Sequence, residues 1–199
     1  RMLQSLIMTD TPHRHSIRLK GYDYTQPGAY FITLLSYRRA CLFGEVIEDE
    51  VRLSVAGKVL EYYWNTLPAH FSVEIDQWVI MPNHFHGTIW LIDDPVRAKQ
   101  PEECRSMEEV SIPGCFALTG VEVVRPHGTI SGSLGAIIQN FKSNTTREIN
   151  HLRHTPGQPV WHRNYYDRIV RNEDELNQIR LYILDNPRQW AEDEHNLLR

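Results

Sequence analysis

Apolar residues recur along this chain with two periods, and the pattern predicts a mixed α+β domain. Runs of strand length, rich in β-branched and aromatic residues, occupy 29–35, 71–80 and 84–91. Pro82-Asn83 interrupts the apolar run between the last two, so we expect a turn there that joins two adjacent strands.

Shorter runs complete the expected sheet. Residues 44–47 and 51–53 flank an acidic tip and predict a small hairpin. Residues 159–170 alternate aromatic, apolar and arginine side chains, which predicts a further strand.

Three segments show the 3.6-residue period of helices. Ser54 is a suitable N-cap for a helix over 55–67 that Pro68 would end, and residues 131–133 would cap a second helix over 134–152. Asn172, with a glutamate three residues later, predicts the start of a third helix that stops before Pro187. On the first helix we expect the core-facing residues to be Val55, Val59, Tyr62, Tyr63 and Thr66.

The remaining segments lack such periods. We interpret residues 1–17 as a loose arm and 93–127, with many acidic, Pro and Gly residues, as a long mobile insertion. The other residues suffice for one core, so 18–199 is expected to form a single domain.

Composition narrows the class of protein only slightly. The net charge of −4 argues weakly against nucleic acid as a partner, although a local basic face is compatible with it. Three cysteines without CxxC spacing suggest neither a disulfide framework nor a zinc site, which fits the cytoplasm. No apolar run reaches the length of a membrane span.

Candidate chemistry begins with His84 and His86. Because they are two residues apart on a predicted strand, both imidazoles point to one face, whereas Phe85 points to the other. Two imidazoles side by side on a rigid strand are a natural pair of ligands for one divalent metal. A single histidine in a strand is more often packed or exposed without a role, so the pair needs a third element.

The third helix supplies that element. Tyr182 and Asn186 are four residues apart and share one face, just before Pro187. A phenol is a poor nucleophile at neutral pH, but a metal that withdraws charge from a phosphate makes its attack feasible. Asn186 could offer its amide oxygen as a further ligand. A half-buried structural tyrosine is the alternative interpretation of Tyr182.

One region is locally basic, namely 128–171, and its guanidinium groups alternate with aromatic rings. Such an arrangement suits phosphate contact and base stacking, although a solvated face explains it equally well. The candidate DNA-binding residues are Lys142, Arg147, Trp161, Arg163, Tyr166 and Arg168.

The order of these motifs resembles a known family. Residues 83–86, Asn-His-Phe-His, resemble the His-hydrophobic-His motif of the HUH nucleases. With Trp161 and 166–172, 180–187 and the opening 21–31, the chain is similar to single-tyrosine transposases, and to REP-associated tyrosine transposases in particular. The resemblance covers residues 18–190 apart from the 93–127 insertion.

The resemblance implies a ferredoxin-like antiparallel sheet with helices packed on one side. It implies Mg²⁺ or Mn²⁺ held by His84 and His86, and a catalytic Tyr182 that attacks a phosphate of single-stranded DNA beside a hairpin, often a REP palindrome. The products would be a 5′-phosphotyrosyl link and a free 3′-OH, and a second 3′-OH could reverse the link. Insertion-sequence relatives commonly have Gln where this chain has Asn186, which leaves the third ligand open.

Several alternatives remain at this point. Tyr165 and Tyr166 are competing nucleophiles. Relatives differ in oligomeric state, so both a monomer and a homodimer that swaps the tyrosine helix are compatible with the sequence. A hairpin-binding domain without catalysis, or a metal-dependent hydrolase of small molecules, would also use parts of this pattern.

Overall fold

The centre of the molecule is a four-stranded antiparallel sheet, seen in a computed structural model that describes residues 19, 21–93, 130–193 and 196. The strands lie in the order β4, β5, β1, β6. Their bounds are Val73–Ile80 for β4, His84–Leu91 for β5, Gly28–Leu35 for β1 and Tyr166–Ile169 for β6. The predicted hairpin is confirmed as β2 (Gly44–Ile47) paired with β3 (Glu50–Leu53).

The two faces of the sheet differ in chemistry because side chains alternate along each strand. On β1, Tyr30, Ile32 and Leu34 are fully buried in the hydrophobic core. The residues between them point the other way, and Thr33 is the register partner of His86 on β5. One face of the two central strands therefore builds the core, and the other carries the histidines.

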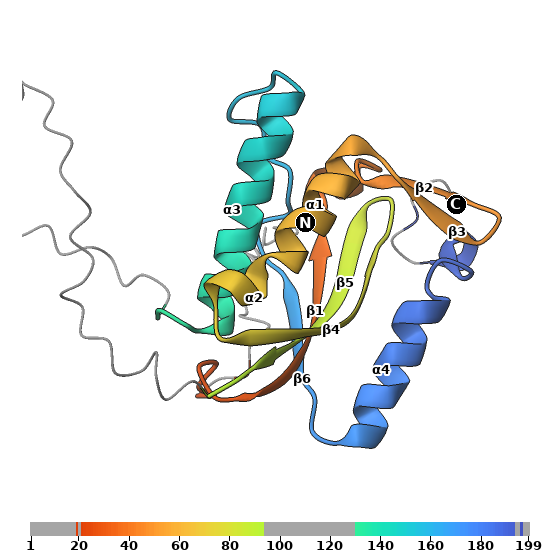
Figure 1. Ribbon diagram of the computed structural model, residues 1–199. Helices are drawn as coiled ribbons and strands as arrows, with labels where there is room; N and C mark the ends of the chain where they lie inside the picture. Colours follow the sequence, from red (N-terminus) through yellow and green to blue (C-terminus); the bar gives the residue numbers. More distant parts are fainter. Residues whose placement is uncertain (1–18, 20, 94–129, 194–195, 197–199) are drawn as a thin grey trace, which may run out of the picture.

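Helices cover both faces (Figure 1). On the core face lie α1 (Val55–Asn65), the short α2 (Leu67–His70) and α3 (Leu134–Leu152). Trp64 of α1 joins these layers, because its ring lies 4.6 Å from that of Phe85 on β5 and 5.5 Å from that of Phe141 on α3. The helix α4 (Glu173–Asp185) lies against the opposite face.

The predicted fold class, an α+β domain with an antiparallel sheet, is confirmed. The position of α4 corrects one detail, because the helices were expected to pack on one side of the sheet. α4 instead buries Leu176, Ile179 and Ile183 over the histidine-bearing face. None of the described helices is long and apolar enough to cross a membrane.

The predicted helix starts are confirmed at all three caps. The Ser54 hydroxyl accepts from the Gly57 N–H at 3.1 Å, and the Ser133 hydroxyl accepts from the Ala136 N–H at 3.3 Å. Asn172 accepts from the Glu175 N–H at 2.8 Å. Each cap satisfies one backbone donor that the first turn of a helix leaves without a partner.

The predicted core stripe of α1 is wrong in part. Leu60 and Trp64 are fully buried, whereas Val55 and Tyr62 are 67% and 64% exposed. The helix carries two apolar stripes, and contact with β5 and α3 selects the one that includes Trp64. Pro68 also differs from expectation, since it lies in the first turn of α2 rather than closing one continuous helix.

The strand predicted over 159–170 is shorter than expected. Only Tyr166–Ile169 forms β6, and Trp161 makes a single isolated bridge with Ser36. The predicted loose arm, 1–17, and the predicted insertion, apart from residue 93, lie outside the described residues.

Candidate active site

Two buried histidines form the floor of the candidate site. His84 and His86 are 0% and 2% exposed, and their ring centroids are 4.6 Å apart. They share a face because β5 is a regular strand through this region, and Phe85 packs into the core on the other face. The sequence predicted both orientations, and the structure confirms them.

Tyr182 reaches this floor from α4. Its hydroxyl lies 3.3 Å from Nε2 of His86, and the two ring centroids are 5.2 Å apart. Phe31 of β1 stacks on His86 with centroids 5.5 Å apart and meets the edge of Tyr182 at 6.1 Å. Tyr182 is nevertheless 41% exposed, so a substrate in solvent can approach it at the histidine.

An ion pair holds α4 to the sheet. Arg180 donates from Nε and Nη2 to both carboxylate oxygens of Asp76 on β4, at 2.6 to 3.1 Å. Burial alone raises the pKa of the Asp76 carboxyl, but the hydrogen bonds and charge of Arg180, with the backbone N–H of Gln77, outweigh it and hold that pKa below 3.8. Asp76 thus stays ionised and keeps the helix in position near neutral pH.

Both imidazoles are held at Nδ1. Asn83 Oδ1 lies 2.9 Å from Nδ1 of His84, and Thr33 Oγ1 lies 2.8 Å from Nδ1 of His86. Partners of this kind orient histidine rings for work at the other nitrogen. The sequence predicted Asn83 in the turn before β5 but gave neither side chain a contact with a histidine, although the pairing of β1 with β5 places Thr33 opposite His86.

Asn186 ends α4, one turn after Tyr182, and it is 2% exposed. Its Oδ1 is buried and has no hydrogen-bond partner among the residues that the structure describes. A buried amide oxygen without a donor is costly unless something else satisfies it, which is consistent with a ligand role.

The donor set suits a divalent cation that also binds phosphate. Within the described ranges, no three His, Cys, Asp or Glu side chains gather closely enough to hold a metal by themselves. The amide oxygen is a donor typical of Mg²⁺ and Mn²⁺, and the two imidazoles are donors typical of divalent transition metals, with the remaining positions left to water or substrate oxygens. Asp193 is also nearby, with Oδ2 3.9 Å from Nε2 of His84.

A cleft of 610 Å³ opens beside Tyr182, between α4 and the histidine-bearing face. It carries two arginines and several groups that can form hydrogen bonds. The lining residues are Phe31, Thr33, Arg39, His86, Tyr166, Arg168, Glu175, Gln178, Ile179 and Tyr182. The sequence analysis did not identify Arg39 or Gln178 as site residues. Arg39 reaches the cleft from a turn after β1, and Gln178 lies one helical turn before Tyr182, and neither belongs to a motif that marks it.

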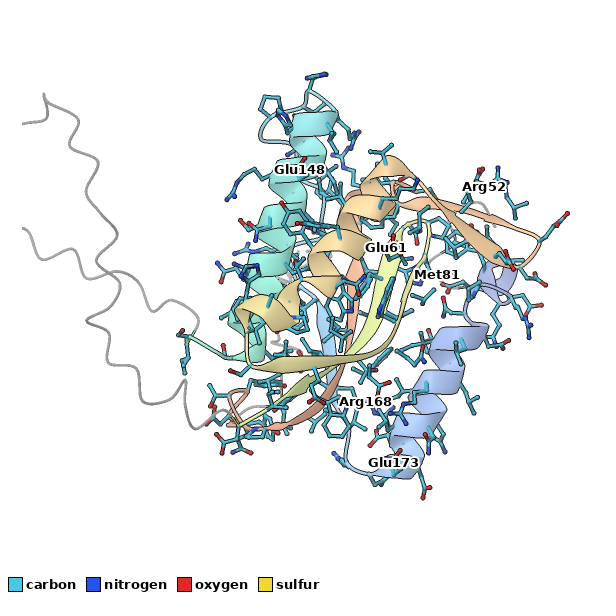
Figure 2. All side chains as sticks on the ribbon, viewed as in Figure 1. Arg52, Glu61, Met81, Glu148, Arg168 and Glu173 are labelled. Atoms are coloured by element: carbon cyan, nitrogen blue, oxygen red, sulfur yellow. The ribbon has the colours of Figure 1, made fainter. Side chains whose placement is uncertain are left out.

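Two of the candidate DNA-binding residues lie at this cleft. Tyr166 is 49% exposed, and Arg168 pairs with Glu175 at 2.6 Å. Figure 2 shows Arg168 beside the start of α4, where Glu173 is labelled. Arg163 is exposed on the loop that precedes β6. Arg147 lies on α3, where it hydrogen-bonds Asn144 at 3.4 Å, on the other side of the sheet from α4.

Lys142 has a structural position. Its ammonium group donates to the carbonyl oxygens of His162 and Arg163 at 2.7 and 3.2 Å, and so holds the loop before β6 against α3. Removal from water lowers the pKa of the Lys142 ammonium to about 8. Its charge is directed at these carbonyls, so we assign it to the support of the loop that carries Arg163.

The expectation that Trp161 stacks on a base needs correction. Trp161 is 6% exposed and belongs to the core, with its ring 4.9 Å from Phe43. Its indole N–H donates to Thr145 at 2.9 Å. A ring enclosed in this way offers no free face to a nucleotide.

Comparison with known proteins gives one relative over nearly the whole chain. An uncharacterized protein of Haemophilus influenzae is 36% identical over 183 residues, which cover 92% of this chain and 92% of that protein. The chain belongs to the same family as this Haemophilus protein. No family model matches the sequence.

The fold is that of a REP-associated tyrosine transposase. The solved structure of such a transposase, bound to a REP hairpin, aligns with 84% of this chain and 71% of its own. The TM-score is 0.52 at 16% sequence identity, so the likeness shows the fold. This is the fold that the sequence resemblance implied.

Proposed function

We propose that the protein nicks single-stranded DNA beside a hairpin and transfers the cut strand, with Tyr182 as the nucleophile. The observation that carries this proposal is the 3.3 Å approach of the Tyr182 hydroxyl to His86, which is 96 positions away in the sequence. The shared fold supports it further, because the transposase of that structure was solved with a REP hairpin bound.

In the proposed reaction the Tyr182 oxygen attacks a backbone phosphorus and displaces the 3′ oxygen of the preceding nucleotide. The phenol loses its proton to solvent, and the 3′ oxygen gains one as it leaves. The cut thus yields a 5′-phosphotyrosyl protein and a free 3′-OH. The ester keeps the energy of the broken bond, so the 3′-OH of another strand can displace Tyr182 by the reverse chemistry.

His84, His86 and Asn186 would hold the Mg²⁺ or Mn²⁺ ion that this family resemblance implies. When bound, such an ion draws negative charge from the phosphate and lowers the barrier to attack by a weak nucleophile. The protein contributes by holding Tyr182 at the site, since α4 is docked through Arg180 and through its buried apolar stripe.

The cleft offers a path for the strand. Arg39 provides positive charge to the phosphates, and the half-exposed ring of Tyr166 offers a stacking surface. Arg168 can also donate to a phosphate, although Glu175 balances its charge. Arg163 and Arg147, away from the cleft, would contact the flanking hairpin. We place this reaction in the cytoplasm, where its DNA substrate lies.

The test is covalent capture of DNA. Wild-type protein, Mn²⁺ and a single-stranded oligonucleotide that carries an imperfect hairpin should give a protein–DNA band on a denaturing gel. Tyr182→Phe should abolish the band and still bind the oligonucleotide in a mobility-shift assay, because only the hydroxyl is lost. Tyr165→Phe is the matched control and should keep the band.

Three outcomes would change the proposal. A band that persists in Tyr182→Phe and disappears in Tyr166→Phe would assign the nucleophile to Tyr166. Hairpin binding without any band, at all metal concentrations, would select a binding domain without catalysis. Full nicking in the presence of a chelator would refute the role of the metal.

A further inference from the structure

Asn83 lies between the histidine site and a turn at the end of β1, and its side chain is fully buried. Two of its contacts point in opposite directions. Its Nδ2 donates to the backbone carbonyl of Arg39 at 3.2 Å, and its Oδ1 lies 2.9 Å from Nδ1 of His84.

The first contact decides the orientation of the amide. A carbonyl oxygen only accepts hydrogen bonds, so the atom of Asn83 that faces Arg39 must be the NH₂ group. The opposite orientation would bring two oxygens together in a buried place and leave both without a hydrogen-bond donor.

The second contact then decides the protonation of His84. An amide oxygen also only accepts, so Nδ1 of His84 must carry a hydrogen. In the neutral imidazole the lone pair is therefore on Nε2, which faces away from Asn83. The Asp193 carboxylate lies 3.9 Å from Nε2, beyond hydrogen-bond distance, so the 2.9 Å contact at Nδ1 is the closer constraint on the ring.

We propose that Asn83 is a positioning residue that holds neutral His84 as its Nδ1–H tautomer, so that the lone pair able to bind a cation is the one on Nε2. The use of that nitrogen for a metal rests on the proposed function, whereas the tautomer does not. His86 has no comparable constraint at Nδ1, because the hydroxyl of Thr33 can donate or accept.

The turn that holds Asn83 has an unusual backbone. Arg38 and Arg39 have φ of 55° and 53°, in the left-handed region that residues other than glycine rarely adopt. Such a conformation is strained and persists where surrounding contacts over-determine it.

Those contacts are present on both sides of the turn. The backbone N–H of Ser36 donates to the carbonyl of Asn83 at 2.9 Å, and the Ser36 hydroxyl donates to the carbonyl of Ala40 at 2.8 Å. The turn therefore places the Arg39 carbonyl against Asn83 and the Arg39 side chain at the cleft.

Imidazole nitrogen NMR tests the proposal directly. Protein labelled with ¹⁵N-histidine is studied at about pH 8, above the ordinary imidazole pKa of about 6.5. The His84 signals are assigned by their loss in His84→Gln. We expect a protonated Nδ1 and an unprotonated Nε2 in the wild type. A protonated Nε2, whether alone or with Nδ1, would overturn the proposal.

Variants add a second readout. Asn83→Leu, which has a similar volume and no acceptor, should shift His84 toward the Nε2–H tautomer, and Asn83→Asp should keep Nδ1–H. Thr33→Val is the matched control and should leave the His84 tautomer unchanged. An unchanged tautomer in Asn83→Leu would contradict the role of Asn83, and the wild-type spectrum decides the question if that variant does not fold.

Mn²⁺ titration separates this inference from the proposed function. Loss of a hydrogen-bond partner behind a ligand typically weakens metal affinity by about 10- to 100-fold, so we expect that loss in Asn83→Leu. Equal Mn²⁺ affinity in the two proteins would contradict the positioning role. If the wild type has the expected tautomer but binds no Mn²⁺, the proposed function fails and the tautomer assignment remains.

Discussion

At the scale of single residues, Trp161 was a candidate for DNA binding, and its hydrogen bond with Thr145 shows that it has a structural role instead. The Thr145 hydroxyl donates to the carbonyl of Phe141 at 2.8 Å and accepts the indole N–H of Trp161 at 2.9 Å. One side chain therefore satisfies a buried donor on the segment that leads to β6.

Thr145→Val should destabilise the protein by about 1–3 kcal/mol, because it leaves the indole N–H of Trp161 buried without an acceptor. Urea unfolding followed by tryptophan fluorescence measures the change. Thr146→Val, the same substitution at a less buried neighbour, is the control and should change the unfolding free energy far less. Equal losses would mean that helix propensity, rather than the hydrogen bond, explains the effect.

Asn186 supports a second prediction at this scale. A ligand that binds only the folded state raises Tm, so Mn²⁺ should raise the Tm of the wild type. In Asn186→Leu this rise should shrink, because the buried amide oxygen is lost while the side-chain volume is kept. Differential scanning calorimetry with and without Mn²⁺ measures both values. The same rise in the variant would remove Asn186 from the proposed ligand set.

At the scale of elements, the docking of α4 is the feature on which the site depends. The helix buries Ile179 and Ile183, and Arg180 pairs with Asp76 on β4. Its position determines where Tyr182 lies, since the rigid helix carries the tyrosine between these anchors.

Asp76→Asn should weaken the docking by about 1–2 kcal/mol, a value between those of exposed pairs and of buried bonds to charged groups. Because the folded pKa of Asp76 is below its ordinary value, its contribution is complete above about pH 4 and is lost as the pH falls through the folded value. The difference in unfolding free energy between wild type and variant should therefore disappear in acid.

Hydrogen exchange of the α4 amides gives a local measure of the same effect, and faster exchange is expected in Asp76→Asn. Glu173→Gln is the control, because Glu173 contacts Arg180 at 3.2 Å but is 69% exposed. Equal acceleration in the two variants would show that the buried pair has no special role.

At the scale of the whole molecule, one chain brings together all the groups that the proposed reaction needs. The central strands β1 and β5 carry the core on one face and the site on the other, and α4 of the same chain covers the site. A homodimer with exchanged helices is therefore not required to bring Tyr182 to His86.

Complementation tests this arrangement. Tyr182→Phe and His84→Ala proteins, co-expressed with different tags and purified together, should give no covalent DNA band, because each chain lacks half of its own site. A helix-swapped dimer would restore one intact site per pair. Recovery of the band would show that the active assembly exchanges α4 between subunits.

The sequence by itself determined the features that depend on local periods. Alternation along β5 placed His84 and His86 on one face, and short polar side chains at Ser54 and Asn172 marked helix starts, since caps satisfy donors within a few residues. The order of the motifs was sufficient to suggest the fold.

Only the tertiary structure decided which apolar stripe of α1 is buried, that Trp161 belongs to the core, and that α4 lies on the histidine face. Each depends on contacts between segments far apart in the chain, which no local pattern encodes. The orientation of Asn83 is of the same kind, because it depends on a carbonyl 44 positions away that a turn with left-handed backbone presents to it.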